Sequence, residues 1–475
     1  MRRAYVPPPG SVPTLPVPSL QGVRRLHLVG IGGAGMRNLA KLLIARGIEV
    51  SGSDLKDSAG LRELERLGAR VHVGHAAERV GEPDALVVSA AIRETNPELV
   101  EARRRGIPVW TRAQALAALA AGARCVAVAG THGKTTTTSM VALVLERAGL
   151  DPSYLVGGEP NETGSGARSG GGGIFVAEAD ESDGTFLLLR PEIGIVTNVE
   201  VDHVDFYRGG REEIEAAFGA FADRCRSVVA CLDDPGTVRA LEGTSAAVIW
   251  YGTDPRARVG VEVKELSPEG AAGIVRIGDE EVEVRLRVDG AHMLRNAAAA
   301  IATAVELGVP AAEAAAALRD FSGVHRRFEF RGTARGAMFY DDYGHVPTEL
   351  AVTLEVARRK RPRRLIAVFQ PHRYARTQAL WRELGASLVA ADVVVVTDVY
   401  GAEQDPIPGV TGKLVVRGVA LAEPRTRVVY LPHRADVVRF LEREVREGDL
   451  VITLGCGDVW MLGDAALRAI REKAS

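Results

Sequence analysis

The stretch Cys125–Thr138, CVAVAGTHGKTTTT, combines a short apolar run, a glycine turn and the beginning of a helical pattern. Cys125–Ala129 is typical of a buried parallel strand, and Thr136–Arg147 carries apolar residues at helical spacing. The turn between them is typical of a phosphate-binding loop, where backbone N–H groups and the helix N-terminus attract an anion. Lys134 would neutralise the phosphate, and the Thr135 hydroxyl would hold Mg²⁺. Valine replaces the first glycine of the strict pattern, but the strand and helix on either side predict nucleoside-triphosphate binding.

The length indicates several domains, and the composition excludes some classes of protein. A chain of 475 residues is long enough for about three domains. The formal charge is 59 − 61 = −2, which gives no indication of a nucleic-acid partner. Four scattered cysteines without a C-x-x-C pair make disulfides and a zinc site unexpected. With no apolar run of about 18 residues and no leader, we expect a soluble, cytoplasmic protein without a membrane partner.

Another glycine loop lies near the N-terminus, and we call it the first glycine loop; the loop that ends at Lys134 and Thr135 is the second. After a proline-rich segment, Leu26–Val29 is a predicted strand, Gly30–Gly35 a tight loop, and Met36–Arg46 a helix. With Asp54 about 20 residues further on, this GxGxxG spacing is the dinucleotide-binding fingerprint. Three interpretations stay open: an NAD(P) site, a site for another diphosphate, or a glycine turn that only packs helix on sheet. A dehydrogenase would have no use for a second phosphate loop.

Acidic residues follow two predicted strands in the middle of the chain. Ile174–Ala177 leads into Glu178, and Ile193–Thr197 leads toward His203. The carboxyl ends of parallel strands face the ligand crevice, so these side chains and Thr135 would form a Mg²⁺ site. The alternatives are a solvated acidic loop and an ordinary polar histidine.

The C-terminal third alternates between strands and helices again. The helices are expected at Pro347–Arg359 and Ala379–Ala390. Three polar clusters, Asp341–His345, Gln370–Arg376 and Asp398–Tyr400, each follow a predicted strand. Three such clusters in succession predict a ligand site at one edge of this sheet.

Taken together, the motifs resemble those of a known enzyme family. They are GTHGKTTTT, EADESD, VTNVEVDHVD, GVHRRF, DDYGHVPTE and QPHRYART, preceded by VGIGGAGM, and in this order they resemble the Mur ligase family. The resemblance implies an α/β fold of three domains after a flexible proline-rich tail at residues 1–21. These are a Rossmann-like UDP-sugar domain at 22–121, a central P-loop ATPase-type domain at 122–322, and a C-terminal Rossmann-like amino-acid domain at 323–475.

The resemblance also implies a reaction. Within the family the motifs are most similar to the member that ligates L-alanine to the lactyl carboxylate of UDP-N-acetylmuramate in peptidoglycan synthesis. The implied cofactors are ATP and Mg²⁺, and the implied assembly is a monomer or weak homodimer. The alternatives are a ligase that attaches a preformed tripeptide to the same sugar nucleotide, an NAD(P)-dependent oxidoreductase, and a non-catalytic nucleotide-binding regulator.

Site residues follow from the matched motifs. The UDP side is implied to be Gly30, Gly32, Gly33, Gly35, Met36, Asp54 and Ser89. The ATP phosphates are implied to lie on Gly130, Thr131, Gly133, Lys134, Thr135 and Thr136, and the metal on Thr135, Glu178 and His203. His292 and Asn296 are implied on the adenine side, with Arg327 and Asp342 as further nucleotide residues. Tyr343, His345, Arg373 and Arg376 are implied to orient the alanine and the substrate's anionic groups. The expected catalytic residues are Lys134, Glu178, His203, His345 and Arg373.

Three positions depart from the family's pattern. Val346 stands where a second histidine is usual, and Met293 follows His292 where an asparagine is common. Glu215 stands where a lysine is usual. We expect Glu215 to be either a permanent carboxylate near the metals or a solvated helix residue, and favour the second.

Overall fold

The computed structural model describes residues 15–89, 91–203, 206–402 and 404–474. Residues 1–14 of the predicted tail lie outside this range. Residues 15–21 form neither helix nor strand, and the carbonyl of Pro16 accepts a hydrogen bond from Gln114 Nε2 at 2.9 Å. The chain divides into two compact units. The first comprises residues up to Lys264 with Ala272–Leu286 and His292–Phe321, and the second comprises Glu265–Ala271, Arg287–Ala291 and the chain from Ser322 onward.

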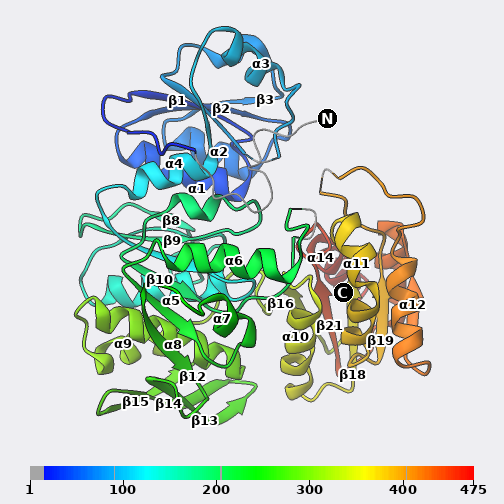
Figure 1. Ribbon diagram of the computed structural model, residues 1–475. Helices are drawn as coiled ribbons and strands as arrows, with labels where there is room; N and C mark the ends of the chain where they lie inside the picture. The colour runs from blue at the N-terminus through cyan, green and yellow to red at the C-terminus, as the bar shows by residue number, and fades with distance from the viewer. Residues whose placement is uncertain (1–14, 90, 204–205, 403, 475) are drawn as a thin grey trace. The chain divides into compact units, whose positions relative to one another are not determined.

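The first sheet of unit 1 has five parallel strands in the order β3-β2-β1-β4-β5. Its strands are β1 (Arg25–Val29), β2 (Glu49–Asp54), β3 (Arg70–Val73), β4 (Ala85–Val88) and β5 (Val109–Thr111). Its helices are α1 (Ala34–Ala45), α2 (Ala59–Arg66), α3 (Pro97–Arg104) and α4 (Arg112–Ala120), with a 3₁₀ turn at Ala77–Val80. Figure 1 shows α3 on one face of this sheet and α1, α2 and α4 on the other. The strand order reverses between β1 and β4, where open α/β sheets bind ligands.

Local capping explains where α3 and α4 begin. Asn96 Oδ1 accepts hydrogen bonds from the N–H groups of Glu98 and Leu99 at 2.9 and 3.3 Å. At α4, Thr111 Oγ1 accepts from Gln114 N at 3.1 Å, and Gln114 Oε1 accepts from Thr111 N at 2.9 Å. This reciprocal pair is a capping box, which fixes the first turn of α4.

The second sheet of unit 1 has ten strands in the order β15-β14-β13-β12-β11-β10-β6-β9-β7-β8. The strands are β6 (Arg124–Ala129), β7 (Ser153–Leu155), β8 (Ala167–Arg168), β9 (Ile174–Glu178), β10 (Ile193–Val196), β11 (Ser227–Cys231), β12 (Ala247–Gly252), β13 (Val259–Ser267), β14 (Gly270–Ile277) and β15 (Glu280–Leu286). The helices are α5 (Lys134–Arg147), α6 (Arg211–Ala222), α7 (Pro235–Ala240), α8 (Ala291–Glu306) and α9 (Ala311–Ala317), with 3₁₀ turns at Thr185–Leu188 and Leu318–Asp320. The central strand β6 pairs in parallel with β9 and β10. One apolar core extends from the first sheet into this one, joining Leu39 of α1 to Phe175 of β9 and Phe218 of α6.

Unit 2 contains a six-stranded sheet in the order β16-β17-β21-β18-β19-β20. Its strands are β16 (Glu329–Ala334), β17 (Ala337–Asp342), β18 (Arg364–Phe369), β19 (Val393–Val396), β20 (Arg427–Tyr430) and β21 (Asp449–Leu454). Its helices are α10 (Pro347–Arg359), α11 (Tyr374–Leu388), α12 (Lys413–Ala422), α13 (Arg434–Glu444) and α14 (Trp460–Ala474). The antiparallel hairpin β16–β17 closes one edge of an otherwise parallel sheet, and apolar clusters cover both faces.

These three sheets confirm the predicted α/β class. Two details of the prediction for unit 2 were wrong. Asp341 and Asp342 do not follow a strand but are its last two residues, because β17 runs to Asp342. The helix expected at Ala379–Ala390 begins at Tyr374, so Arg376 lies in a helix and not in a loop.

Candidate active site

The second glycine loop is a tight turn between β6 and α5 that other segments hold in place. Gly130 has a φ of 137°, and a Cβ added there would lie 2.0 Å from Thr197 Oγ1, so only glycine fits. The N–H of His132 donates to Asn198 Oδ1 at 2.8 Å, and Asn198 Nδ2 donates to the carbonyl of His132 at 3.1 Å. The amide of Asn198 therefore fixes the middle of the loop. Sequence reasoning did not single out Asn198, whose only signal was its position directly after a strand.

Lys134 is tied to the loop and to a buried carboxylate. Its Nζ donates to the carbonyls of Gly130 and Thr131 at 2.5 and 3.2 Å, and lies 2.9 Å from Glu181 Oε2. Burial by itself would lower the pKa of Lys134, but the nearby carboxylates, Glu181 first among them, outweigh it and raise this pKa. Burial raises the pKa of Glu181, which is 1% exposed, to about 7. Glu181 belongs to the acidic run but was not among the predicted site residues.

The structure brings two of the three predicted metal ligands into contact. Thr135 Oγ1 donates to Glu178 Oε1 at 3.1 Å, and the N–H of Gly157 donates to Glu178 Oε2 at 2.8 Å. His203 Nε2 instead lies 3.9 Å from Glu181 Oε1, the oxygen that accepts from Lys134. Over the described ranges, no three His, Cys, Asp or Glu side chains form a group that could hold a metal. A hydroxyl, one carboxylate and one imidazole fit Mg²⁺ only if phosphate oxygens complete its shell.

Of the other residues predicted for the nucleotide, those in unit 1 lie in the loop itself or in α5 and α8. Gly133 caps α5 with a φ of 78°, and a Cβ there would be 3.2 Å from Asn296 Oδ1, so the predicted adenine-side helix α8 meets the loop. His292 is in the first turn of α8. Thr131 Oγ1 accepts from the N–H of Glu200 at 2.8 Å. Thr136 is buried in α5, so its backbone N–H, and not its side-chain hydroxyl, is the group that can contact a phosphate.

The first glycine loop brings together the predicted UDP-side residues. Gly30 has a φ of 79°, and a Cβ there would lie 3.2 Å from Ser89 Oγ. The N–H of Gly32 donates to Asp54 Oδ2 at 2.9 Å, and the N–H of Gly30 donates to the carbonyl of Ser53 at 2.8 Å. Asp54 and Ser89 therefore meet at this loop. Met36 is 2% exposed and part of the core, so its side chain supports the loop from behind.

Gly33 and Gly35 complete this loop at the beginning of α1. Gly33 is the residue before α1, and its N–H donates to the carbonyl of Gly30 at 3.3 Å. Gly35 lies in the first turn, where an added Cβ would be 3.4 Å from Arg112 Nη1. Arg112 was not predicted, because nothing in its local sequence separates it from other helix-terminal arginines.

Unit 2 gathers aromatic and basic side chains from three separate segments. The guanidinium carbons of Arg326 and Arg327 each lie 5.0 Å from the ring centroid of Tyr343. The ring of His345 lies 5.8 Å from Tyr343 and 5.8 Å from His372. The predicted residues Arg327, Tyr343 and His345 thus form one cluster, which His372 extends.

The other predicted residues of unit 2 have defined partners. Asp342 accepts from the N–H groups of Phe328 and Gly344 at 2.8 and 2.7 Å, and burial raises its pKa to about 6. Asp342 therefore also shapes the turn around it. Arg376 is 6% exposed, with Nη1 3.2 Å from His372 Nδ1. Arg373 precedes α11 with a φ of 66°.

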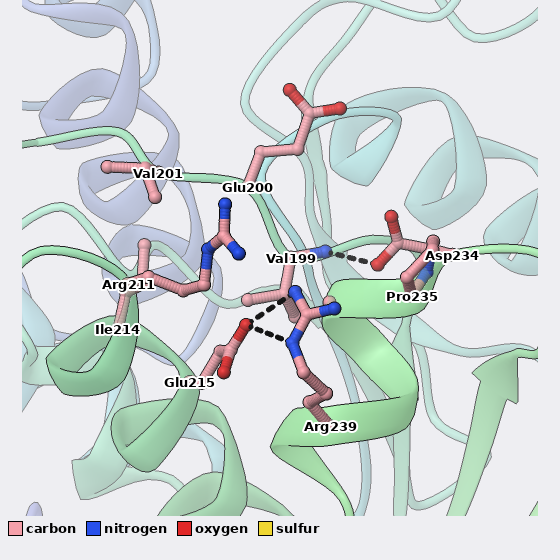
Figure 2. Close-up of a pocket in the computed structure, with 10 residues that line it drawn as sticks. Val199, Glu200, Val201, Arg211, Ile214, Glu215, Asp234, Pro235 and Arg239 are labelled. Atoms are coloured by element: carbon pink, nitrogen blue, oxygen red, sulfur yellow. Dashed lines mark hydrogen bonds and ion pairs between the residues drawn. The ribbon is translucent and has the colours of Figure 1, made fainter.

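The structure shows the surroundings of Glu215 and Val346, two of the three residues that depart from the family pattern. Figure 2 shows Glu215 of α6 bound to Arg239 of α7, with Oε1 2.7 Å from Nη2 and 2.9 Å from Nε. This pair lines a surface hollow of about 450 Å³ together with Arg211 and Glu200. Glu215 is therefore a partly exposed helix residue that pairs with a second helix at a surface hollow, and its role as a carboxylate near the metals stays a prediction. Val346 is buried at the beginning of α10.

Three models of one protein family together match most of the chain. Residues 25–124 match the model described as "Mur ligase family, catalytic domain". Residues 128–304 match "Mur ligase middle domain", and residues 326–457 match "Mur ligase, glutamate ligase domain".

Individual relatives agree with these models. A UDP-N-acetylmuramate–L-alanine ligase of Saccharopolyspora erythraea is 46% identical over 465 residues, 95% of this chain and 94% of that protein. The solved UDP-N-acetylmuramate–alanine ligase of Thermotoga maritima has a TM-score of 0.79 at 28% identity and covers 94% of this chain and 99% of its own. A murein peptide ligase of Psychrobacter arcticus has a TM-score of 0.74 at 25% identity, over 94% and 98% of the two chains. Among the helices described for this chain, none has the length and apolar character needed to cross a membrane.

Proposed function

Because this chain belongs to the Mur ligase family, we propose that it joins L-alanine to the lactyl carboxylate of UDP-N-acetylmuramate at the expense of ATP. One observation carries the choice of substrates. The relative that is 46% identical over 95% of the chain is named for this reaction. The two glycine loops of unit 1 support it, since a sugar nucleotide and ATP need separate anion sites.

The first step would be phosphoryl transfer at the second loop. A lactyl carboxylate oxygen bonds to the γ-phosphorus of ATP while the bond from that phosphorus to the β–γ bridging oxygen breaks. The products are an acyl phosphate and ADP. Bringing a carboxylate to a triphosphate opposes two anions, so positive charge must offset them throughout the transfer. Lys134 would supply that charge by exchanging Glu181 for the phosphate oxygens.

Thr135, Glu178 and His203 would hold Mg²⁺. When bound, Mg²⁺ supplies charge neutralisation and orientation of the phosphate oxygens. The glycine at position 157 supports the role of Glu178, because an added Cβ would lie 2.7 Å from Glu178 Oε2. The carboxylate therefore needs this open backbone to reach Thr135.

The second step would be attack of the uncharged alanine amine on the acyl phosphate. The nitrogen bonds to the acyl carbon, the bond from that carbon to the phosphate oxygen breaks, and an amine proton passes to a base. We propose His345 as that base. Its Nδ1 lies 3.1 Å from the carbonyl of Tyr343, an arrangement in which Nδ1 carries the hydrogen and Nε2 the lone pair. Arg373 or Arg376 would pair with the alanine carboxylate, for which a guanidinium offers two parallel donors.

Phosphate release tests this function directly. The protein would be incubated with ATP, Mg²⁺ and UDP-N-acetylmuramate, adding L-alanine, glycine, L-serine or a stem tripeptide in separate reactions. We expect release that requires both the sugar nucleotide and L-alanine. Release with the tripeptide alone would move the assignment to a muropeptide ligase. No release with any acceptor, despite ATP binding, would overturn the proposed function.

A further inference from the structure

Arg112 lies beside the first glycine loop, and the first turn of its helix fixes its position there. It is the first residue of α4, and the capping box of Thr111 and Gln114 fixes that turn. Its guanidinium reaches Gly35, where Nη1 and Cδ would be 3.4 and 3.5 Å from an added Cβ. The side chain is 27% exposed. The guanidinium therefore lies at the surface of the turn whose N–H groups are predicted to receive a diphosphate.

This loop has no positive charge of its own. The residues from Gly30 to Gly35 carry no cationic side chain. Arg37, one turn further along α1, is bound to Glu159, with Nη2 2.6 Å from Oε1. The next cation on this helix, Lys41, is bound to Glu63 at 2.7 Å. Arg112 is thus well placed to supply the charge that a doubly phosphorylated ligand requires.

The partner of Arg112 belongs to the acidic segment of the second loop. Arg112 Nη2 lies 3.3 Å from Asp180 Oδ2, while Asp180 Oδ1 accepts from the N–H of Ser182 at 3.0 Å. The next residue, Glu181, binds Lys134. Two consecutive carboxylates therefore each hold one cation, and each cation lies beside one of the two glycine loops.

We propose that Arg112 is a binding residue for an anionic group of the sugar nucleotide, and that Asp180 holds its guanidinium until that anion replaces it. The anion is either the diphosphate or the lactyl carboxylate, which share the two-oxygen geometry that a guanidinium binds. A single contact of 3.3 Å between partly exposed groups is a weak ion pair, and a diphosphate with more charge competes with it effectively. This inference rests on the proposed function, because it needs a sugar nucleotide at the first loop.

Equilibrium binding to the full chain, without ATP, tests the role of Arg112. The ligands are UDP, UDP-N-acetylglucosamine and UDP-N-acetylmuramate, of which only the last carries the carboxylate. We expect Arg112→Gln to raise the dissociation constant roughly 10- to 100-fold, the range for loss of a charge-assisted contact. The matched control is Arg124→Gln, which removes another arginine bound to a carboxylate, Glu192, at 2.9 Å and should change binding less than about twofold.

Each outcome bears on the inference. Weaker binding of all three ligands identifies the diphosphate, and weaker binding of UDP-N-acetylmuramate alone identifies the carboxylate. Unchanged binding of all three by Arg112→Gln would overturn the role of Arg112 and leave the proposed function intact. Failure of the unaltered protein to bind any of them would overturn both.

Asp180→Asn tests the holding role separately. Removing the carboxylate charge frees the guanidinium, so we expect sugar-nucleotide binding that is as tight as in the unaltered protein or a few-fold tighter. Binding weakened tenfold would show that Asp180 itself contacts the ligand, which contradicts the holding role. Thermal unfolding midpoints within about 2 °C of the unaltered protein would confirm that both variants remain folded.

Discussion

The two glycine loops of unit 1 have the same strand–turn–helix plan but obtain their charge in different ways. The second loop carries its own cation and hydroxyl, Lys134 and Thr135, in the first turn of its helix. The first loop has only glycines, alanine and isoleucine, and its nearby charged groups come from β2 and α4 as Asp54 and Arg112. A loop with its own cation can be recognised from sequence, whereas one that depends on distant residues has to be seen folded.

The largest difference between the loops should appear when the cation of the second is removed. We expect Lys134→Met to lower alanine-dependent phosphate release by at least about 10³-fold, since the transferred phosphoryl group loses its main fixed charge. UDP-N-acetylglucosamine should bind as before, because the first loop is unchanged. The control Lys264→Met removes an exposed lysine bound to Glu262 and should leave turnover unaltered. Loss of nucleotide-sugar binding in Lys134→Met would contradict the separation of the two sites.

Adding one methyl group to each loop should give unequal losses of stability. In Gly130→Ala the Cβ meets Thr197 Oγ1 at 2.0 Å and the residue keeps a φ of 137°, a conformation that costs alanine about 1–3 kcal/mol. We expect its thermal midpoint to fall by roughly 5 °C. Gly32→Ala meets the movable carboxylate of Asp54 at 2.9 Å, so its midpoint should fall by about half as much. Equal losses in a thermal denaturation experiment would show that both loops are equally tight.

The side chains that brace the loops should also differ in effect. Asn198→Ala leaves both the N–H and the carbonyl of His132 without their amide partner, so we expect ATP to bind about tenfold more weakly. Asp54→Asn keeps an oxygen that can accept from Gly32, and UDP binding should weaken about threefold or less. Calorimetric titration with each nucleotide measures both. A larger loss in Asp54→Asn would mean that its charge contacts the ligand.

The smallest expected effect is a change in how the stability of the fold depends on pH in the acid range. It concerns Glu98, which contacts Ser53 next to the first loop. Glu98 is fully buried and accepts from the hydroxyl of Ser53, the residue before Asp54, at 2.5 Å. Burial would raise the pKa of Glu98, but the hydrogen bond and charge of His27 and the hydroxyl of Ser53 outweigh it, and this pKa lies below its ordinary value. A lowered pKa stabilises the fold above the ordinary value of 4.5 and loses that contribution as the pH falls below it.

Glu98→Gln should therefore be less stable than the unaltered protein near pH 6, and this difference should narrow as the pH falls below about 4.5. The readout is the thermal midpoint between pH 6 and pH 3.5. A difference that stays constant with pH would show that packing, and not the charge of Glu98, supports this side of the first loop.

Local patterns predicted most of the regular structure. The helix Pro347–Arg359 was predicted with its observed bounds, because a proline at its first position and regular apolar spacing mark it. The beginning of α11 was missed, since the left-handed turn before it, with a φ of 66°, is made by Arg373 and not by the glycine that usually marks such a turn. Both glycine loops were predicted because glycines at fixed spacing after a strand are a local signal.

The supporting residues of the site could not be predicted in the same way. Asn198 is bonded to His132 from 66 positions away, and Arg112 is bonded to Asp180 from 68 positions away. Such partners meet only after the sheets have formed. The ion pair between Glu215 and Arg239 could not be predicted either, because the sequence around each residue is that of an ordinary helix surface. The predicted roles in ligand and metal binding rest on motifs and stay predictions.

Because the first two sheets share one apolar core, the first domain of this enzyme cannot be expressed or exchanged by itself without exposing apolar side chains. Leu39 of α1 packs in the same cluster as Phe175 of β9, and Asn38 Nδ2 donates to the carbonyl of Val156 across the junction. Residues 22–121 expressed alone would expose that apolar face to water, and a chimera cut at residue 121 would have to match it side chain by side chain. Protein engineers who wish to exchange sugar-nucleotide specificity should therefore graft loops onto unit 1 and keep its two sheets together.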